Sequence, residues 1–225
     1  TTALSAASAQ AAVLTYDADT GAAGAQDGAG AGWDTTNASF WDGAANVVWP
    51  AAGTDEAVFG AGSGTAGTVA VGTISAGAIT FNTPGSGAYT LSGGAITLDG
   101  TAPTIAANVN ATIVSDLAGT GGLTKSGAGV LTLSGTLAYT GDTVVDGGTL
   151  VLNKGGTLGG GNTGQFSSSG HTITVNDGAV LRMTQSWAMG DGQQHHLVAN
   201  GGTIEFSNSD NYQSSIELTG GAIVT

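Results

Sequence analysis

A short sequence word recurs along the chain, and this repetition constrains the fold more than any other feature. Each copy has a glycine, a small residue and then apolar residues that alternate with polar ones: GAITF from Gly77, GAITL from Gly94, GVLTL from Gly129, GTLVL from Gly148, GAVLRM from Gly178, GTIEF from Gly202 and GAIVT from Gly221. The intervals between these glycines are 17, 35, 19, 30, 24 and 19 residues, and the longest leaves room for one more unit, ATIVSDL around Ile113. One strand-bearing unit every ~20 to 30 residues is typical of a solenoid, whose units bury their apolar faces against one another.

The alternation inside each word predicts which side chains face the interior. In GAITL, Ile96 and Leu98 point to one side of the strand and Thr97 points to the other. The same rule leaves the charged Glu205 and Arg182 outside. Glycine pairs stand just before the words, where a tight corner needs positive φ; they are Gly93-Gly94, Gly147-Gly148 and Gly201-Gly202. The pattern predicts turns between short strands, with ladders of Thr, Ser and Asn outside and columns of Leu, Ile and Val inside.

Glycine supplies 41 of the 225 residues, which disfavours helices because each glycine in a helix interior costs about 1 kcal/mol relative to alanine. Collagen is excluded, since the glycines have no three-residue period and there are only three prolines. We therefore expect an all-β chain folded as a parallel β-helix, a β-solenoid. A β-sandwich is the rival fold, because its turns also recur at short intervals, but the repeated words favour the solenoid.

The charge balance excludes several classes of partner. Sixteen acidic residues stand against Lys125, Lys154 and Arg182, so the formal net charge is -13. Such a chain does not bind nucleic acid or anionic lipid by charge, and no apolar run is long enough for a membrane helix of its own.

Cysteine is absent, so the fold uses no disulfides. The small-residue pattern Ala9-Gln10-Ala11 is similar to the end of a signal peptide, but cleavage upstream of Thr1 is the simpler interpretation.

The segment 121–153, GGLTKSGAGVLTLSGTLAYTGDTVVDGGTLVLN, resembles the passenger-associated transport repeat, also called the autotransporter-associated β-strand repeat. Its marks are GGLTKSGAG, LTLSG, YTG and the final DGGTLVLN. Upstream, the Trp-containing stretch, DEAVFG and YTLSGGAITL resemble the segment that commonly precedes such repeats. The resemblance implies a right-handed β-helix at the bacterial surface or secreted from the cell, with an adhesive or structural role. It also implies that the repeat helps the passenger to fold while it crosses the outer membrane.

Aromatic residues divide the chain into two parts. Residues 1–60 contain three of the four tryptophans, Trp33, Trp41 and Trp49, and we expect them to form an N-terminal extension with an aromatic cap over the first coil. Residues 61–225 then form the β-solenoid, continuous with the cap in a single domain. The alternative is a carbohydrate platform, in which the three indoles stack on sugar rings while nearby polar side chains bind hydroxyls; those are Asp34, Asp42 and Asn46.

The charged residues do not suggest an enzyme. The three cations are most simply solvated surface charges, and the acids are dispersed instead of paired as in hydrolases. The acid pairs Asp17 with Asp19 and Asp142 with Asp146 are explained as turn formers. The serines at 167–169 precede His171 without a nucleophile elbow. We therefore expect no catalytic residues.

The histidine pair His195-His196 is the only candidate for adjacent metal ligands. Neighbouring residues on a strand point to opposite faces, so the two imidazoles do not chelate one metal unless they lie in a loop. A histidine pair in a loop, without a metal, is the simpler interpretation. The chain has no zinc spacing and no calcium-binding nonapeptide repeat. We expect no cofactor, and Asp-containing turns would bind Ca²⁺ only weakly.

Two non-catalytic extracellular functions remain. The first is a structural subunit that assembles head-to-tail into a surface fibre or sheath through its two ends, whose candidate contacts are Thr1, Leu4, Val13, Leu14, Ile223 and Val224. In this hypothesis the segment before residue 15 adds as a strand to the open edge of another copy. The second is an adhesin or passenger module that binds a polysaccharide or a host surface. The sequence favours the fibre and keeps a polysaccharide-active enzyme as a third alternative.

Overall fold

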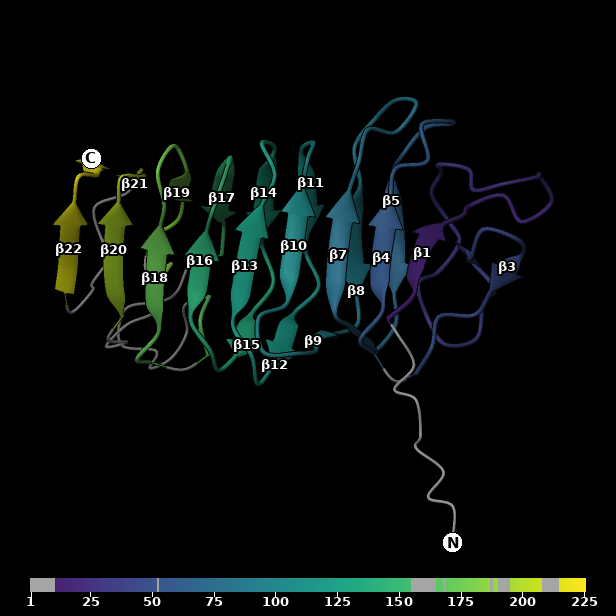
Figure 1. The fold of residues 1–225 in the computed structure, drawn as a ribbon, viewed down its shortest axis with the longest axis horizontal. Helices are drawn as coiled ribbons and strands as arrows, with labels where there is room; N and C mark the ends of the chain where they lie inside the picture. Colours follow the sequence, from purple (N-terminus) through teal and green to yellow (C-terminus); the bar gives the residue numbers. More distant parts are fainter. Residues whose placement is uncertain are drawn as a thin grey trace, which may run out of the picture.

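A computed structural model describes residues 11–51, 53–154, 165–167, 169–186, 188–189, 195–207 and 215–225. These residues form strands, bridges and turns and no helix. The strands stack side by side along one direction, so the molecule is a rod with the first and last strands at opposite ends (Figure 1).

The strands belong to three sheets. The first sheet has the order β22 (Ser215–Thr219), β20 (His196–Asn200), β18 (Thr172–Val175), β16 (Thr143–Val145), β13 (Leu123–Ser126), β10 (Thr104–Ala107), β7 (Ala78–Phe81), β4 (Glu56–Phe59), β1 (Val13–Tyr16), β2 (Phe40–Trp41) and β3 (Asn46–Val47). The second has the order β23 (Ala222–Val224), β21 (Thr203–Phe206), β19 (Val180–Met183), β17 (Thr149–Leu152), β14 (Val130–Leu133), β11 (Ala111–Ile113), β8 (Thr90–Gly93) and β5 (Thr68–Val71). The third contains β15 (Leu137–Tyr139), β12 (Leu117–Gly119), β9 (Ile96–Leu98) and β6 (Ile74–Ala76).

Successive coils pair in parallel, which is the arrangement of a right-handed β-solenoid of about 7 turns. β10, for example, pairs with β7 on one side and β13 on the other, so that Ile105 lies opposite Ile79 and Lys125. The solenoid predicted from the repeated words is therefore confirmed, and the parallel order excludes the β-sandwich. The additional unit around Ile113 is also present, as strand β11.

The predicted alternation is confirmed along the strands. Ile96 and Leu98 are buried while Thr97 between them is partly exposed, and Arg182 and Glu205 face outward and pair with each other at 2.5 Å. The predicted ladders are present as well. Register places four threonines on one line across the outer face of the second sheet, from β5 to β14: Thr68, Thr90, Thr112 and Thr132.

Lys125 is the exception, because we expected a solvated surface charge and the structure buries it completely. It sits on β13 two residues after the buried Leu123, so the strand alternation directs it into the core. Its Nζ donates hydrogen bonds of 2.7 to 2.8 Å to three backbone carbonyls, those of Gly127, Gly129 and Gly147. The ammonium thus joins the turns of two successive coils.

Close packing of coils explains the glycine at one of the predicted corners. Gly148 has φ +58, and a Cβ there would lie 2.5 Å from the carbonyl oxygen of Gly129 in the preceding coil. Both the backbone conformation and the lack of space therefore require glycine. Gly93 and Gly201 also have positive φ, as the Gly-Gly steps predicted.

The two ends of the rod differ. At the N-terminal end, the first sheet continues past β1 into the antiparallel strands β2 and β3, and Trp33 bridges to Val71 on the edge of β5. At the other end, β22 and β23 are the last strands of their sheets, and Leu218, Ile223 and Val224 have exposed fractions of 54%, 37% and 50%. The segment between β1 and β4 therefore lies over one end, and the edge of the last coil forms the other (Figure 1).

Candidate functional site

A cleft of about 520 Å³ lies in the N-terminal part of the rod, and we call it the end cleft. It is formed by the segment between β1 and β2 and by Asn46 of β3. One part of its lining is small and uncharged, namely Ala18, residues 29–32 and Ala38; the other part is polar, namely Thr20, Asn37, Ser39 and Asn46.

Hydrogen bonds to buried groups fix the walls of the end cleft. The Asp17 carboxylate, which is fully buried, accepts bonds from the backbone N–H of Asp19 and Gln26 at 3.0 Å. The Tyr16 hydroxyl donates to the carbonyl of Ala31, and Ser39 Oγ donates to the carbonyl of Gly32. Burial raises the pKa of Tyr16 to about 12, so this hydroxyl remains a donor at physiological pH.

The amides of Asn46 and Asn37 are held by carboxylates. Asn46 Nδ2 donates to Asp17 Oδ2 at 2.8 Å and to the carbonyl of Ala38 at 3.4 Å, which leaves Oδ1 as the acceptor of this amide. Asn37 Nδ2 donates to Asp34 Oδ2 at 2.6 Å. Hydrogen bonds from the Thr36 hydroxyl and from the backbone and side chain of Asn37 lower the pKa of Asp34 to about 2. The carboxylate stays ionised at neutral pH and links residues 34, 36 and 37 of this loop through hydrogen bonds.

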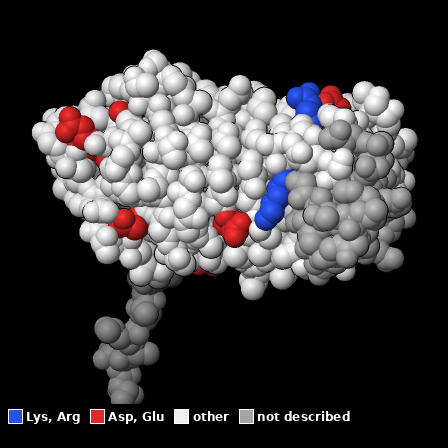
Figure 2. All heavy atoms as spheres, turned by 180° about the vertical axis from the view of Figure 1, so that it is seen from behind, with Lys and Arg blue, Asp and Glu red and all other residues white. Residues whose placement is uncertain are grey.

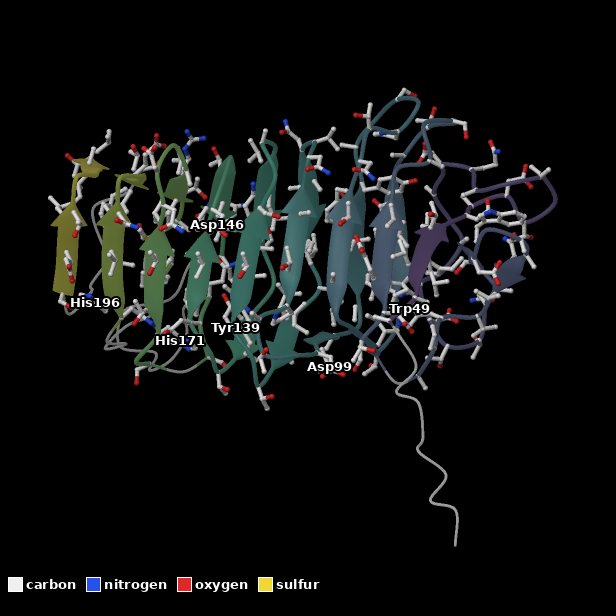
Figure 3. All side chains as sticks on the ribbon, in the orientation of Figure 1. Trp49, Asp99, Tyr139, Asp146, His171 and His196 are labelled. Carbon is white, nitrogen blue, oxygen red and sulfur yellow. The ribbon has the colours of Figure 1, made fainter. Side chains whose placement is uncertain are left out.

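The three tryptophans do not lie together on the surface. Trp33 and Trp49 are buried, and with Tyr16, Phe40 and Phe59 they form a cluster whose ring centroids are 4.8 to 6.1 Å apart. Figure 3 shows Trp49 within the N-terminal part of the rod. Neither buried indole offers a face to a ligand, so the platform of three indoles expected from the sequence is corrected.

Trp41 differs from the other two indoles because it is only partly buried. It lies opposite Asn46 in the β2–β3 pair and opposite Thr15 of β1. Residues directly opposite one another in an antiparallel pair project from the same face. The indole of Trp41 therefore stands next to an amide that lines the end cleft.

The residues proposed for assembly separate into different environments. Val13 is 59% exposed, but Leu14 is buried, and both belong to β1, which pairs with β4 of the same chain. Ile223 and Val224 are exposed on β23 at the other end. Thr1 and Leu4 lie outside the described residues.

The structure places His196 on β20, where the sequence favoured a loop for this histidine pair, and the two side chains occupy opposite faces as neighbours on a strand do. His195 is buried, and its ring stacks on that of His171 with centroids 5.5 Å apart and planes at 21°. His196 is on β20 and faces outward, where its Nδ1 lies 2.6 Å from Ser215 Oγ. Figure 3 shows His171 and Tyr139 on the same side of the solenoid, and their rings are 6.0 Å apart. Among the residues that the structure describes, no three His, Cys, Asp or Glu side chains gather as metal ligands.

The acid pairs act in turns and between coils. Asp17 Oδ1 and Asp19 Oδ1 each accept a bond from a backbone N–H two residues later, as expected of turn formers. Asp142 and Asp146 reach the next coil instead, where they accept bonds from Thr172 N and Asn176 Nδ2. Ser168 lies outside the described residues, so the serine run before His171 is placed only in part.

Comparisons with known proteins agree with this architecture. The model of the passenger-associated transport repeat matches residues 123–152, within the segment predicted from the sequence. The chain is 40% identical over 176 residues to the "Adhesin BmaC autotransporter" of Brucella suis biovar 1 (strain 1330). This alignment covers 75% of the chain and 5% of the relative, so the chain spans only a small part of that protein's length. No solved structure matches the chain.

The location of the protein follows from the repeat and from this relative. Within the described part of the chain, no helix is long and apolar enough to cross a membrane. The predicted extracellular or cell-surface location is confirmed. The chain is a β-solenoid protein that carries the passenger-associated transport repeat of bacterial surface and secreted proteins.

Proposed function

We propose that the chain is a segment of an adhesin passenger, a non-catalytic β-solenoid that attaches a bacterium to a host or polysaccharide surface. The single observation that carries the proposal is the 40% identity over 176 residues to a protein named as an autotransporter adhesin. The passenger-associated transport repeat at residues 123–152 supports the same assignment.

The physical properties of the rod suit this function. Coils joined by parallel strand pairs form a continuous ladder along the rod, so the segment is a stiff spacer that can hold a binding region away from the membrane. Charged side chains are sparse on the face seen from behind, with wide uncharged areas between them (Figure 2). Such a face is not repelled by an anionic cell surface as strongly as the net charge of -13 would suggest.

The comparisons favour the adhesin over the head-to-tail fibre that the sequence favoured. The geometry of the ends agrees with that preference. A fibre needs the exposed edge of β22 and β23 to meet a complementary edge, and the opposite end of the rod has its first sheet extended by the short antiparallel strands β2 and β3. The first sheet therefore offers no parallel edge there of the kind that joins the coils.

Adhesion of the purified chain tests the proposal. The chain would be coupled through an engineered N-terminal tag to fluorescent beads, and retention under flow would be measured on cultured mammalian cells and on immobilised polysaccharide. Beads coated with a different β-solenoid of similar length and net charge serve as the control. Retention above that control on at least one surface is the expected result, and equal retention on every surface would overturn the proposal.

A further inference from the structure

The end cleft has the size of a small-molecule site and is open to solvent. Its volume of about 520 Å³ lies within the ~300 to 1,000 Å³ typical of ligand pockets. Within the described residues its loops occur once, whereas the outer faces of the sheets repeat from coil to coil. A ligand that must be recognised specifically needs such a unique arrangement of groups.

The chemistry of the lining points to an uncharged ligand. The residues that form the cleft are neutral, and the hydrogen-bonding side chains among them are Thr20, Asn37, Ser39 and Asn46. The nearby carboxylate of Asp34 already accepts bonds from Thr36 and Asn37. An anion would meet no positive side chain in this lining and would be repelled by the net charge of -13. A compound with many hydroxyls and no charge fits both properties.

Trp41 and Asn46 supply the two kinds of contact that a sugar ring uses. A pyranose has an apolar face of C–H groups and a rim of hydroxyls, so it binds where an indole lies beside a hydrogen-bonding amide. The β2–β3 pairing places the partly exposed indole of Trp41 next to Asn46, whose Oδ1 is left to accept a bond from a hydroxyl. Thr20, exposed on the opposite loop, adds a hydroxyl that both donates and accepts.

The walls are already ordered without a ligand. Asn46 is held by the buried Asp17, Ala31 by the Tyr16 hydroxyl, and Gly32 by Ser39. The buried aromatic cluster that contains Trp33 and Trp49 packs with Tyr16 and Phe40, so it supports β1 and β2 from within. Binding to a preformed site loses little conformational entropy, which favours affinity for a small ligand.

We propose that the end cleft binds an uncharged saccharide, with Trp41 stacked on a sugar ring and Asn46, Asn37 and Thr20 bonded to its hydroxyls. This inference rests on the proposed function, because it names the chemical class that the adhesin segment recognises. It retains one of the three tryptophans considered from the sequence and gives it a position beside a cleft.

An array of immobilised neutral and acidic oligosaccharides tests the inference, with the purified full chain as the probe. Four variants accompany the parent: Trp41→Ala, Trp41→Tyr, Ala38→Gln, which fills the cleft from an exposed lining position, and Val114→Ala, a control on an exposed residue of the solenoid side. Circular dichroism and the melting temperature check that each variant folds. We expect binding to neutral saccharides that falls about tenfold or more in Trp41→Ala and Ala38→Gln. Trp41→Tyr retains part of the affinity, and Val114→Ala binds like the parent.

The outcomes separate this inference from the proposed function, because the same variants are measured in the bead adhesion assay. Absence of binding to every neutral saccharide, a preference for acidic ones, or equal binding by folded Trp41→Ala and Ala38→Gln variants would overturn the saccharide site. If the parent beads adhere and the cleft variants adhere equally well, the adhesin proposal stands and the saccharide site is wrong. If saccharides bind in the cleft but no surface retains the beads, the adhesin proposal fails and the site stands.

Discussion

Acidification should weaken this solenoid through one buried imidazole, that of His195. The side chain is 1% exposed, its ring lies 4.9 Å from that of Phe166 and 5.5 Å from that of His171, and its Nε2 is 3.1 Å from the carbonyl oxygen of Met189. A carbonyl only accepts, so Nε2 carries the hydrogen in the neutral ring. Nδ1 has no hydrogen-bond partner among the described residues. A proton added there would be buried next to a second imidazole.

The size of the effect follows from the pKa. Burial, and secondarily the charge of His171, lower the pKa of His195 from 6.5 to about 4. The unfolded chain therefore takes up a proton at a higher pH than the folded chain does. Stability contributed by neutral His195 is present above pH 6.5 and is lost as the pH falls towards 4. At about 1.4 kcal/mol per pKa unit, the loss amounts to about 3 kcal/mol, a large share of the ~5 to 15 kcal/mol of a typical domain.

Urea unfolding at pH 7.5, 6, 5 and 4, followed by circular dichroism, measures this loss. Because aspartates also titrate, the informative quantity is the difference between the parent and His195→Phe, which keeps a ring in the stack and removes the titration. We expect the parent to lose about 3 kcal/mol more than His195→Phe between pH 7.5 and 4. His196→Gln, on the outer face, should follow the parent. Equal losses in the parent and His195→Phe, or an NMR titration of His195 near pH 6.5, would refute the reasoning.

Four further substitutions test buried hydrogen bonds and the close approach of the coils. Lys125→Met removes the donor shared by three backbone carbonyls, one of them in a buried hydrogen bond, and a loss of about 2 to 4 kcal/mol in urea unfolding is expected; unchanged stability would show that the ammonium is not needed there. Tyr89→Phe removes a 2.8 Å hydrogen bond to Asp27, and we expect a loss of about 1 to 2 kcal/mol together with faster amide exchange in the loop around Asp27. Gly148→Ala should cost about 2 kcal/mol or more in thermal unfolding, whereas Gly178→Ala, also at positive φ but in open space, should cost only about 1 kcal/mol. Similar losses for the two glycine variants would contradict the close approach of the coils.

Much of the solenoid is predictable because its information is local. A word such as GAITL contains both the alternation that buries Ile96 and Leu98 and the preceding glycines that turn the corner. Lys125 follows the same alternation, although its charge alone predicts a surface position. The pattern of Leu123, Thr124 and Lys125 already directs the lysine inward, and its side chain is stabilised there by carbonyls of the turns, which a charge-based argument overlooks.

The N-terminal part of the chain was less predictable because its contacts are distant in sequence. Asp27 accepts bonds from the backbone N–H of Ala61 and Ser63 and from the Tyr89 hydroxyl, and no spacing rule relates these residues. The tryptophans illustrate the same difficulty. A glycine-rich segment with several tryptophans is compatible with both a buried aromatic cluster and a surface platform. Only the packing shows that Trp33 is buried while Trp41 is partly exposed.

The outer faces of the sheets and the end cleft differ in how specifically each could recognise a ligand. Along the sides, register repeats the same small residues from strand to strand, as the threonine line from Thr68 to Thr132 shows, so a ligand there meets several equivalent positions. Equivalent positions let a repetitive ligand bind at several points at once, but they do not distinguish one ligand from another. The end cleft combines two amides and two hydroxyls, and strand register places the indole of Trp41 next to one of those amides, Asn46. Loss of specificity should therefore follow substitution at Trp41 or Ala38, and substitution along the threonine line should leave the preferred ligand unchanged.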